Sequence, residues 1–443
     1  MNLFGTDGIR GIYGADLTIS LTYSLGMALL SRQKGGIVVV GRDTRMSGEA
    51  LAEGFIRGIN DNGGQVINLG IVPTNAVAHY VRRIGADYGV MISASHNPPN
   101  YNGLKLFDRY GVKICAQKQA EISEFLRDNK VELPMFSVET PIFKGADDIY
   151  MEDIKKLFPT SLKGIKIALD CCYGSAYKLA KEIFLALEAT LIVYCDFNRG
   201  DMINVGCGAT NTDFLQKLMK ANGCELGFAF DGDADRIAVF EKTEILHPDR
   251  IFYAFAKYFK EKGCLNKNTV VGTILTDTGL QKCLNKLDIT LLRTDVGDSK
   301  IYEMMTKNGL NVGGENSGHY ILSDYATCSD AIINALLVSE IYIKHGSLLE
   351  YTKEYKPYKS QSLNISVKEN AMEEIKKSDK LEEIKSHFAL KFPNLKLVLR
   401  LSGTEPKIRI YVEGRSAPTC NVAIDYLTGE INAYLDNIKC KTF

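Results

Sequence analysis

The stretch Ile37–Ile92 reads IVVVGRDTRMSGEALAEGFIRGINDNGGQVINLGIVPTNAVAHYVRRIGADYGVMI. It contains three short apolar runs, which are typical of strands buried in a parallel sheet; they occupy Ile37–Gly41, Gln65–Leu69 and Tyr88–Ile92. Segments with helical spacing of apolar residues begin at Ser47, a favoured helix N-cap, and at Pro73. The stretch is therefore predicted to form a βαβαβ unit with a parallel sheet and right-handed crossovers.

The same order of elements recurs twice further along the chain. Strands are predicted at Ile165–Asp170, Thr190–Asp196 and Glu225–Phe230, and again at Val270–Leu275, Ile289–Asp295 and Leu310–Gly313. The intervening helices are predicted at Ala176–Glu188, Asp213–Ala221, Thr278–Lys286 and Asp298–Lys307. This repetition predicts three consecutive three-layer α/β/α domains of βαβαβ type.

The pattern changes beyond Tyr358. Strands are predicted at Ser362–Val367, Lys396–Leu401 and Ile408–Glu413, with helices at Glu373–Phe388 and Pro418–Leu435. These elements favour a C-terminal α+β domain able to fold alone. The predicted domains are 1–145, 146–248, 249–356 and 357–443.

Composition excludes several classes of partner. The 443 residues include 53 basic and 53 acidic side chains, and this balance argues against a nucleic-acid surface or a polybasic membrane patch. No membrane span is expected, because the apolar segment Ala331–Ile343 is short and contains Asn334. No signal peptide is visible, and eleven cysteines without zinc spacings suggest reduced thiols used as core filler, so a cytoplasmic protein is expected.

Polar loops follow the third strand of each repeat. They read SASHNP, DGDADR and ENSGH in the first, second and third units. Open α/β sheets bind ligands beyond the carboxyl ends of their strands. We therefore expect the three units to face one cleft that these loops line.

The second loop contains carboxylates at alternate positions. Asp231, Asp233 and Asp235 can point the same way in a turning loop, and such oxygen ligands suit Mg²⁺ or Ca²⁺. The alternative is a solvated acidic turn. The apolar run Leu226–Phe230 presents the loop from a buried strand, so a metal site is favoured.

The first loop holds a hydroxyl in a reactive setting. Ser95 lies beside His96, Pro98 ends any helix, and Lys105 follows Gly103. A plain polar turn is the alternative. GRDTR, after the first strand, favours a structural pairing of Asp43 with the arginines.

Two further stretches offer ligand groups. ENSGH presents the carboxylate of Glu315 and the imidazole of His319, which suit sugar hydroxyls or an amine. RLSGTEPKIR, Arg400–Arg409, combines a turn of small residues with flanking guanidinium groups that match phosphate, although a plain hairpin is the alternative. FGTDGIRG places Arg10 where it can reach a phosphate.

Together these motifs resemble the α-D-phosphohexomutase superfamily from Phe4 to about Gly414. Asn316 within ENSGH, Gly403 within LSGTEP and the stretch CGATNTDFL resemble the glucosamine branch. The resemblance implies an enzyme that interconverts glucosamine 6-phosphate and glucosamine 1-phosphate through a phosphoserine and a 1,6-bisphosphate, for UDP-N-acetylglucosamine and cell-wall synthesis. It also implies a possible homodimer.

The resemblance implies roles for individual residues. Ser95 would carry the phosphate and, with Asp231, Asp233 and Asp235, bind one Mg²⁺ per chain. Lys105 is the first candidate for general acid/base, His319 the second, and His96 would position the loop. The residues expected to bind substrate are Arg10, Arg236, Glu315, Ser317, Arg400, Ser402, Gly403, Thr404 and Arg409.

The chain departs from the family pattern at Ser299, where relatives usually have arginine; Lys300 is a candidate substitute. Two alternatives stay open: a phosphoglucomutase/phosphomannomutase with the same machinery, and a catalytically silent metal-binding relative. A serine-metal phosphatase is disfavoured, because it should show His-rich zinc spacing.

Overall fold

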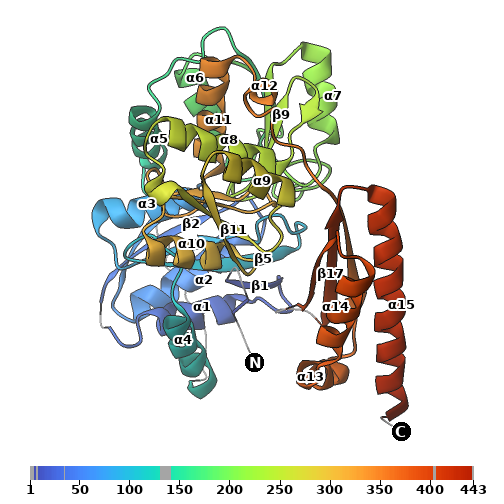
Figure 1. Cartoon of the computed structure of the whole chain (residues 1–443). Helices are drawn as coiled ribbons and strands as arrows, with labels where there is room; N and C mark the ends of the chain where they lie inside the picture. Colours follow the sequence, from blue (N-terminus) through green and yellow to red (C-terminus); the bar gives the residue numbers. More distant parts are fainter. Residues whose placement is uncertain (1–3, 6–7, 34, 130–140, 403–405, 442–443) are drawn as a thin grey trace.

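The computed structural model describes residues 4–441 except 6–7, 34, 130–140 and 403–405. Figure 1 shows three sheets with their helices gathered on one side of the molecule, and the C-terminal sheet and its helices standing beside them. Over the described residues, no helix is both long and apolar enough to cross a membrane.

The first sheet has the strand order β1-β5-β4-β2-β3. Its strands are β1 (Ile9–Ile12), β2 (Ile37–Arg42), β3 (Gln65–Ile71), β4 (Tyr88–Ile92) and β5 (Tyr101–Asp108). Its helices are α1 (Ile19–Leu29), α2 (Gly48–Asp61), α3 (Thr74–Ile84) and α4 (Ala116–Asp128). Strands β2, β3 and β4 are parallel, as predicted, and the Ser95 loop follows β4.

The second sheet repeats this plan in the order β10-β9-β8-β6-β7. Its strands are β6 (Lys166–Asp170), β7 (Thr190–Tyr194), β8 (Leu226–Phe230), β9 (Ile237–Glu241) and β10 (Glu244–Ile245). The helices are α5 (Ala146–Leu157), α6 (Leu179–Ala186) and α7 (Asp213–Asn222). Because β8 is fully buried, it presents the acidic loop from the interior.

The third sheet has the order β12-β11-β13-β14. Its strands are β11 (Thr269–Thr273), β12 (Thr290–Thr294), β13 (Val312–Gly314) and β14 (Tyr320–Leu322). Its helices are α8 (Pro248–Glu261), the short 3₁₀ helix at Asn266–Asn268, α9 (Thr278–Lys286), α10 (Asp298–Asn308), α11 (Ala331–His345) and α12 (Leu348–Tyr351). The order second-first-third of the parallel strands is therefore the same in all three units.

The C-terminal unit has a three-stranded antiparallel sheet in the order β15-β17-β16. Its elements are β15 (Lys359–Ser366), α13 (Glu369–Lys377), α14 (Lys380–Lys391), β16 (Lys396–Leu401), β17 (Lys407–Gly414) and α15 (Ala417–Lys441). This unit has its own apolar core, which includes Phe388, Ile408 and Leu427. A separate, continuous core runs through all three α/β units.

Three predictions of local structure were wrong. The sheets are mixed rather than parallel, because an antiparallel strand follows each third parallel strand: β5, β9 and β14. Ser47 precedes α2 without capping it, since its hydroxyl accepts a hydrogen bond from Asn102 instead. The helix predicted at Glu373–Phe388 is two helices, α13 and α14.

Candidate active site

The three polar loops converge. Ser95 Oγ donates a hydrogen bond of 2.6 Å to Asp231 Oδ2, which joins the first unit to the second. Lys105 Nζ, on β5, lies 2.5 Å from Asp235 Oδ2. His319, from the third unit, places Nδ1 3.8 Å from Asp235 Oδ1. Residues far apart in the sequence thus form one buried polar cluster.

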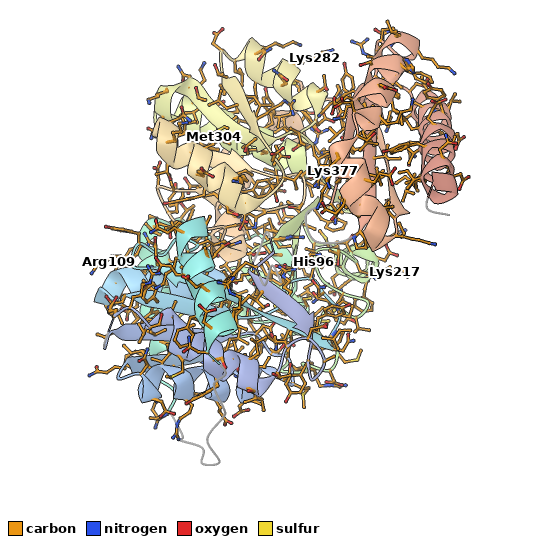
Figure 2. All side chains as sticks on the ribbon, turned by 90° about the horizontal axis from the view of Figure 1, so that it is seen from below. His96, Arg109, Lys217, Lys282, Met304 and Lys377 are labelled. Carbon is orange, nitrogen blue, oxygen red and sulfur yellow. The ribbon has the colours of Figure 1, made fainter. Side chains whose placement is uncertain are left out.

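The backbone of the Ser95 loop is held in an uncommon conformation. Ser95 has a φ of 52°, in the left-handed region, and its side chain is buried. Its N–H donates to Ser93 Oγ, and Ser93 in turn donates to Asp43 Oδ2. These bonds support the turn that points the Ser95 hydroxyl at Asp231. His96 Nδ1 lies 3.4 Å from that hydroxyl, and Figure 2 shows His96 near the centre of the molecule.

Arg45 supports the same loop, and sequence reasoning missed this role. The predicted pairing with Asp43 is confirmed, with Nε 2.9 Å from Asp43 Oδ2. The fully buried guanidinium also donates to four carbonyl oxygens, those of Ser95, Asn97 and Pro98 in the loop and that of Tyr101 at the start of β5. Only the planar guanidinium group of arginine, with its five N–H donors, can reach all of these acceptors. The sequence signal was weak, since Asp and Arg two residues apart are common in loops.

The acidic loop is equally constrained. Asp231 Oδ1 accepts hydrogen bonds from the N–H groups of Asp235 and Arg236, and Ala234 has a φ of 57°. A Cβ added to Gly232 would lie 2.6 Å from the carbonyl oxygen of Ser95, so only glycine allows the two loops to come this close. The acidic loop therefore packs closely against the Ser95 loop of the first unit.

The carboxylates fit a hard cation. One oxygen each from Asp231, Asp233 and Asp235 lies within 4.8 Å of the others. Within the described part of the chain, Oδ1 of Asp233 and Oδ1 of Asp235 are buried and have no hydrogen-bond partner. Buried oxygens without partners are costly unless a ligand satisfies them. This donor set consists of oxygen atoms, as Mg²⁺ and Ca²⁺ prefer.

The pKa values of Asp231 and Asp235 are shifted in opposite directions. Burial and the charges of Asp235 and Asp233 raise the pKa of Asp231 to about 7. Burial also opposes ionisation of Asp235, but Lys105 and His319 hold its pKa well below the usual value. A divalent cation would favour the ionised form of the loop.

The pKa values of the two histidines are shifted in opposite directions. Burial and the guanidinium groups of Arg236 and Arg10 lower the pKa of His96 to about 4, so His96 is neutral near pH 7. Burial acts in the same direction on His319, but Asp235, together with other nearby carboxylates, raises the pKa of His319 above the usual value. His319 Nε2 also lies 3.5 Å from Asp298 Oδ2.

In the ENSGH loop of the third unit, hydrogen bonds orient the carboxylate of Glu315. Glu315 Oε1 accepts a 2.8 Å hydrogen bond from the N–H of Gly297, and Ser317 Oγ lies 3.2 Å from Glu315 Oε2. Lys300 lies 3.4 Å from Glu303 on the largely exposed face of α10. The structure therefore gives no support to Lys300 as a substitute for the family arginine.

The remaining cationic residues lie around this cluster. Arg400 and Arg409 are opposite each other on β16 and β17. Burial and the charge of Arg409 lower the pKa of Arg400, and the carboxylates of Asp295 and Glu315 act in the opposite direction. Arg10 donates to Asn97 Oδ1 at 3.0 Å, and Arg236 Nε is 3.9 Å from an Asp235 oxygen. Ser402 is buried, whereas Gly403 and Thr404 lie outside the described residues.

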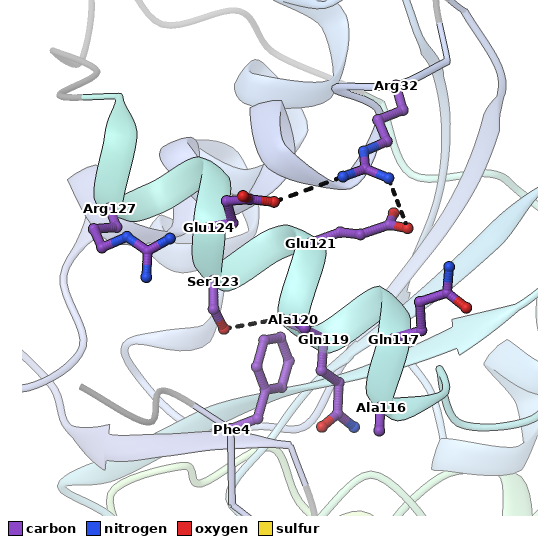
Figure 3. A pocket seen from close by; sticks show the side chains of 10 residues that line it. All are labelled: Phe4, Arg32, Ala116, Gln117, Gln119, Ala120, Glu121, Ser123, Glu124 and Arg127. Carbon is purple, nitrogen blue, oxygen red and sulfur yellow. Dashed lines mark hydrogen bonds and ion pairs between the residues drawn. The ribbon is translucent and has the colours of Figure 1, made fainter.

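A surface pocket of about 780 Å³ lies elsewhere, on α4. Figure 3 shows Phe4 below the helix and Arg32 paired with Glu121 and Glu124 above it. The pocket is lined by Phe4, Arg32, Ala116, Gln117, Gln119, Ala120, Glu121, Ser123, Glu124 and Arg127. No residue of the polar cluster is in this lining, so the pocket is separate from the candidate site.

Comparison with known families covers all four units. The phosphoglucomutase/phosphomannomutase α/β/α domains I, II and III match residues 1–132, 148–244 and 247–358. The C-terminal domain of the same family matches residues 363–421. A Burkholderia thailandensis phosphoglucomutase/phosphomannomutase family protein has the same fold, with a TM-score of 0.80 at 22% identity over 98% of this chain and 97% of its own.

Similar sequences define the branch of the family. A phosphoglucosamine mutase of Thermotoga sp. (strain RQ2) is 40% identical over 99% of this chain and 100% of its own length. A phosphoglucosamine mutase of Caldanaerobacter subterraneus subsp. tengcongensis is 41% identical over 93% of this chain and 94% of its own. The chain therefore belongs to the phosphoglucosamine mutases, phosphosugar isomerases of the phosphoglucomutase/phosphomannomutase family.

Proposed function

We propose that the enzyme interconverts glucosamine 6-phosphate and glucosamine 1-phosphate through phospho-Ser95 and a 1,6-bisphosphate, which also serves as the activating intermediate. The observation that carries this proposal is the 2.6 Å hydrogen bond from Ser95 Oγ to Asp231 Oδ2. This bond joins a buried hydroxyl of the SASHNP loop to a carboxylate of the proposed cation site. The product would supply UDP-N-acetylglucosamine and cell-wall synthesis.

In the first half-reaction, O1 of glucosamine 6-phosphate attacks the phosphorus on Ser95. A bond from O1 to phosphorus forms, the bond from Ser95 Oγ to phosphorus breaks, and the proton lost by O1 is the proton that Oγ gains. Lys105 is proposed to relay it, with His319 second, because both lie in the buried cluster beside Asp235. His96 is proposed to position the loop. The second half-reaction is the reverse, with O6 in place of O1, after the bisphosphate turns over.

Asp231, Asp233 and Asp235, with the phosphate on Ser95, are proposed to bind one Mg²⁺. When bound, this ion would neutralise charge on the transferring phosphoryl group, which is most of what phosphoryl transfer requires. Two of these carboxylates also bind Lys105, whose Nζ lies 2.6 Å from Asp233 Oδ2 and 2.5 Å from Asp235 Oδ2. The protein therefore supplies a fixed cation of its own beside the proposed ion.

The non-reacting phosphate is proposed to bind the C-terminal unit through Arg400, Ser402, Gly403, Thr404 and Arg409, with Arg10 and Arg236 near the reacting phosphate. Glu315 and Ser317 are proposed to contact the sugar. Two facing guanidinium groups repel each other, so a dianion between them would be strongly bound. Exchange of the two phosphates then requires the bisphosphate to turn between this site and Ser95.

A comparison of turnover on amino and neutral sugar phosphates tests which substrate the enzyme prefers. We expect kcat/KM for glucosamine 6-phosphate to exceed that for glucose 6-phosphate at least tenfold, since a carboxylate paired with the substrate ammonium contributes about 1.4 kcal/mol or more. Glu315→Gln should reduce kcat/KM on the amino sugar more than on the neutral sugar. Equal turnover of both sugars by the wild-type enzyme would instead favour a phosphoglucomutase/phosphomannomutase.

A further inference from the structure

Three cysteines and an aspartate form a second cluster in the second unit. Asp170 ends β6, Cys195 follows β7, and Cys172 and Cys207 lie in the adjoining loops. All four side chains are buried, each at 2% exposure or less. The mutase reaction proposed above uses none of them.

The donor atoms of the cluster are close enough to share one ion. One oxygen of Asp170 and the sulfur atoms of Cys195 and Cys207 all lie within 4.8 Å of one another. Cys172 packs against the same two cysteines and is within hydrogen-bonding reach of Cys207. In a tetrahedral zinc site with Zn–S bonds of about 2.3 Å the sulfur atoms are about 3.8 Å apart, so movements of up to about 1 Å would bring Cys195 and Cys207 to this spacing.

We propose that Asp170, Cys172, Cys195 and Cys207 bind a structural Zn²⁺ ion. Thiolate ligands select a soft or borderline ion such as zinc and reject Mg²⁺, so the site is chemically distinct from the all-oxygen acidic loop. The Asp170 carboxylate is already oriented, because its two oxygens accept hydrogen bonds from the N–H groups of Cys172 and Gly208. Such oriented ligands are usual in metal sites.

The backbone around the cluster is shaped to bring the sulfur atoms together. Cys172 has a φ of 59° and Cys195 a φ of 55°, a conformation that is uncommon outside glycine. A Cβ added to Gly208, which follows Cys207, would lie 2.5 Å from Cys172 Sγ. The loop can therefore approach the thiols only with glycine at this position, and a bound ion would offset the cost of this arrangement.

The cluster also contacts the candidate active site. Cys172 Sγ lies 2.8 Å from Asn204 Oδ1, and Asn204 Nδ2 donates to the carbonyl oxygens of Ser95 and Asn97. Zinc binding would replace the Cys172 thiol proton that Asn204 Oδ1 accepts, so the ion would change the contact between the cluster and the Ser95 loop.

Cobalt binding to the full-length protein tests the site. The metal-free enzyme is titrated with Co²⁺ in excess Mg²⁺, which occupies the acidic loop, while thiolate-to-cobalt charge-transfer absorption is recorded. We expect one equivalent of Co²⁺ to produce this band and one equivalent of Zn²⁺ to abolish it. Cys207→Ala and Cys195→Ala should weaken Co²⁺ binding at least tenfold.

Cys224→Ala is the matched control, because Cys224 is also buried in the second unit but lies in a separate apolar cluster. It should retain the band unchanged. If the Cys207 variant does not fold, Asp170→Asn provides the same test without removing a thiol. Absence of the band in the wild-type protein, or its persistence in a folded ligand variant, would overturn the proposal.

Discussion

Replacing Arg45 by lysine should disable the enzyme without touching the reacting groups. The guanidinium makes five side-chain hydrogen bonds, one to Asp43, three to carbonyl oxygens of the Ser95 loop and one to the carbonyl oxygen of Tyr101 at the start of β5. A lysine ammonium has only three donors and lacks the planar fork, so at least two of these acceptors lose their partner.

The magnitude follows from those lost bonds. Each hydrogen bond to a charged group contributes about 1.5–3 kcal/mol, so the loss of two costs about 3–6 kcal/mol. The lower end applies, because Asn204 Nδ2 still donates to the carbonyl oxygens of Ser95 and Asn97. We therefore expect the free energy of unfolding to fall by about 3 kcal/mol.

Activity should fall as well, because Arg45 fixes the turn that aims Ser95 Oγ. A misplacement of about 1 Å at a reacting atom costs on the order of 100-fold in rate, and we expect that loss in kcat. Denaturant unfolding and steady-state turnover measure the two effects. Arg57→Lys is the control, since Arg57 pairs with Asp61 on the partly exposed face of α2 and should lose less than about 0.5 kcal/mol. Wild-type stability and kcat in Arg45→Lys would refute this reasoning.

Three other perturbations have definite outcomes. Gly232→Ala should lower kcat about 100-fold while the protein stays folded, because its Cβ would lie 2.6 Å from the Ser95 carbonyl oxygen and separate the loops. Chelation of divalent ions, or Asp233→Asn, should abolish turnover, and added Mg²⁺ should restore it only in the wild type. Burial and nearby carboxylates raise the pKa of Asp249 to about 7, so ionised Asp249 destabilises the folded state. Stability from this group is therefore present below about pH 4 and is lost as the pH rises to 7. Relative to Asp249→Asn, wild-type stability should fall by about 3 kcal/mol between pH 5 and pH 8 in urea unfolding.

Each of these results has a contrary outcome. Wild-type kcat in Gly232→Ala would show that the two loops need not touch during turnover. Full activity after complete chelation would remove the role of the acidic loop as a cation site. A constant difference in stability between the wild type and Asp249→Asn at all pH values would show that Asp249 is not buried in its ionised form.

The repeating units could be predicted from the sequence, because each parallel strand and its helix carry their own periodicity. The strands β5, β9 and β14 escaped prediction as parts of these sheets. An antiparallel strand that adds to an existing sheet is defined by its pairing partner, and that partner is not encoded locally. Ser47 shows the same limit, since its hydroxyl is used by Asn102 on a distant strand.

The acidic loop and Ser95 could be singled out from sequence because their residue types already limit their chemistry. Their contact could only be inferred from equivalent positions in two repeats, and the structure confirms it. The role of Arg45 could not be predicted, because its four carbonyl acceptors are backbone atoms with no sequence signature. The sequence likewise favours core filler for the cysteine cluster, since its members come from separate strands and loops and show no zinc spacing.

The central claim is that Ser95 carries the transferring phosphate. Intact-mass measurement of the wild-type enzyme, after incubation with glucose 1,6-bisphosphate, tests it most directly, with Ser95→Ala as the matched variant. The account predicts a single added phosphate on the wild-type chain, none on Ser95→Ala, and loss of mutase turnover in that variant. A Ser95→Ala enzyme that still gains the phosphate, or still turns over at the wild-type rate, would contradict it.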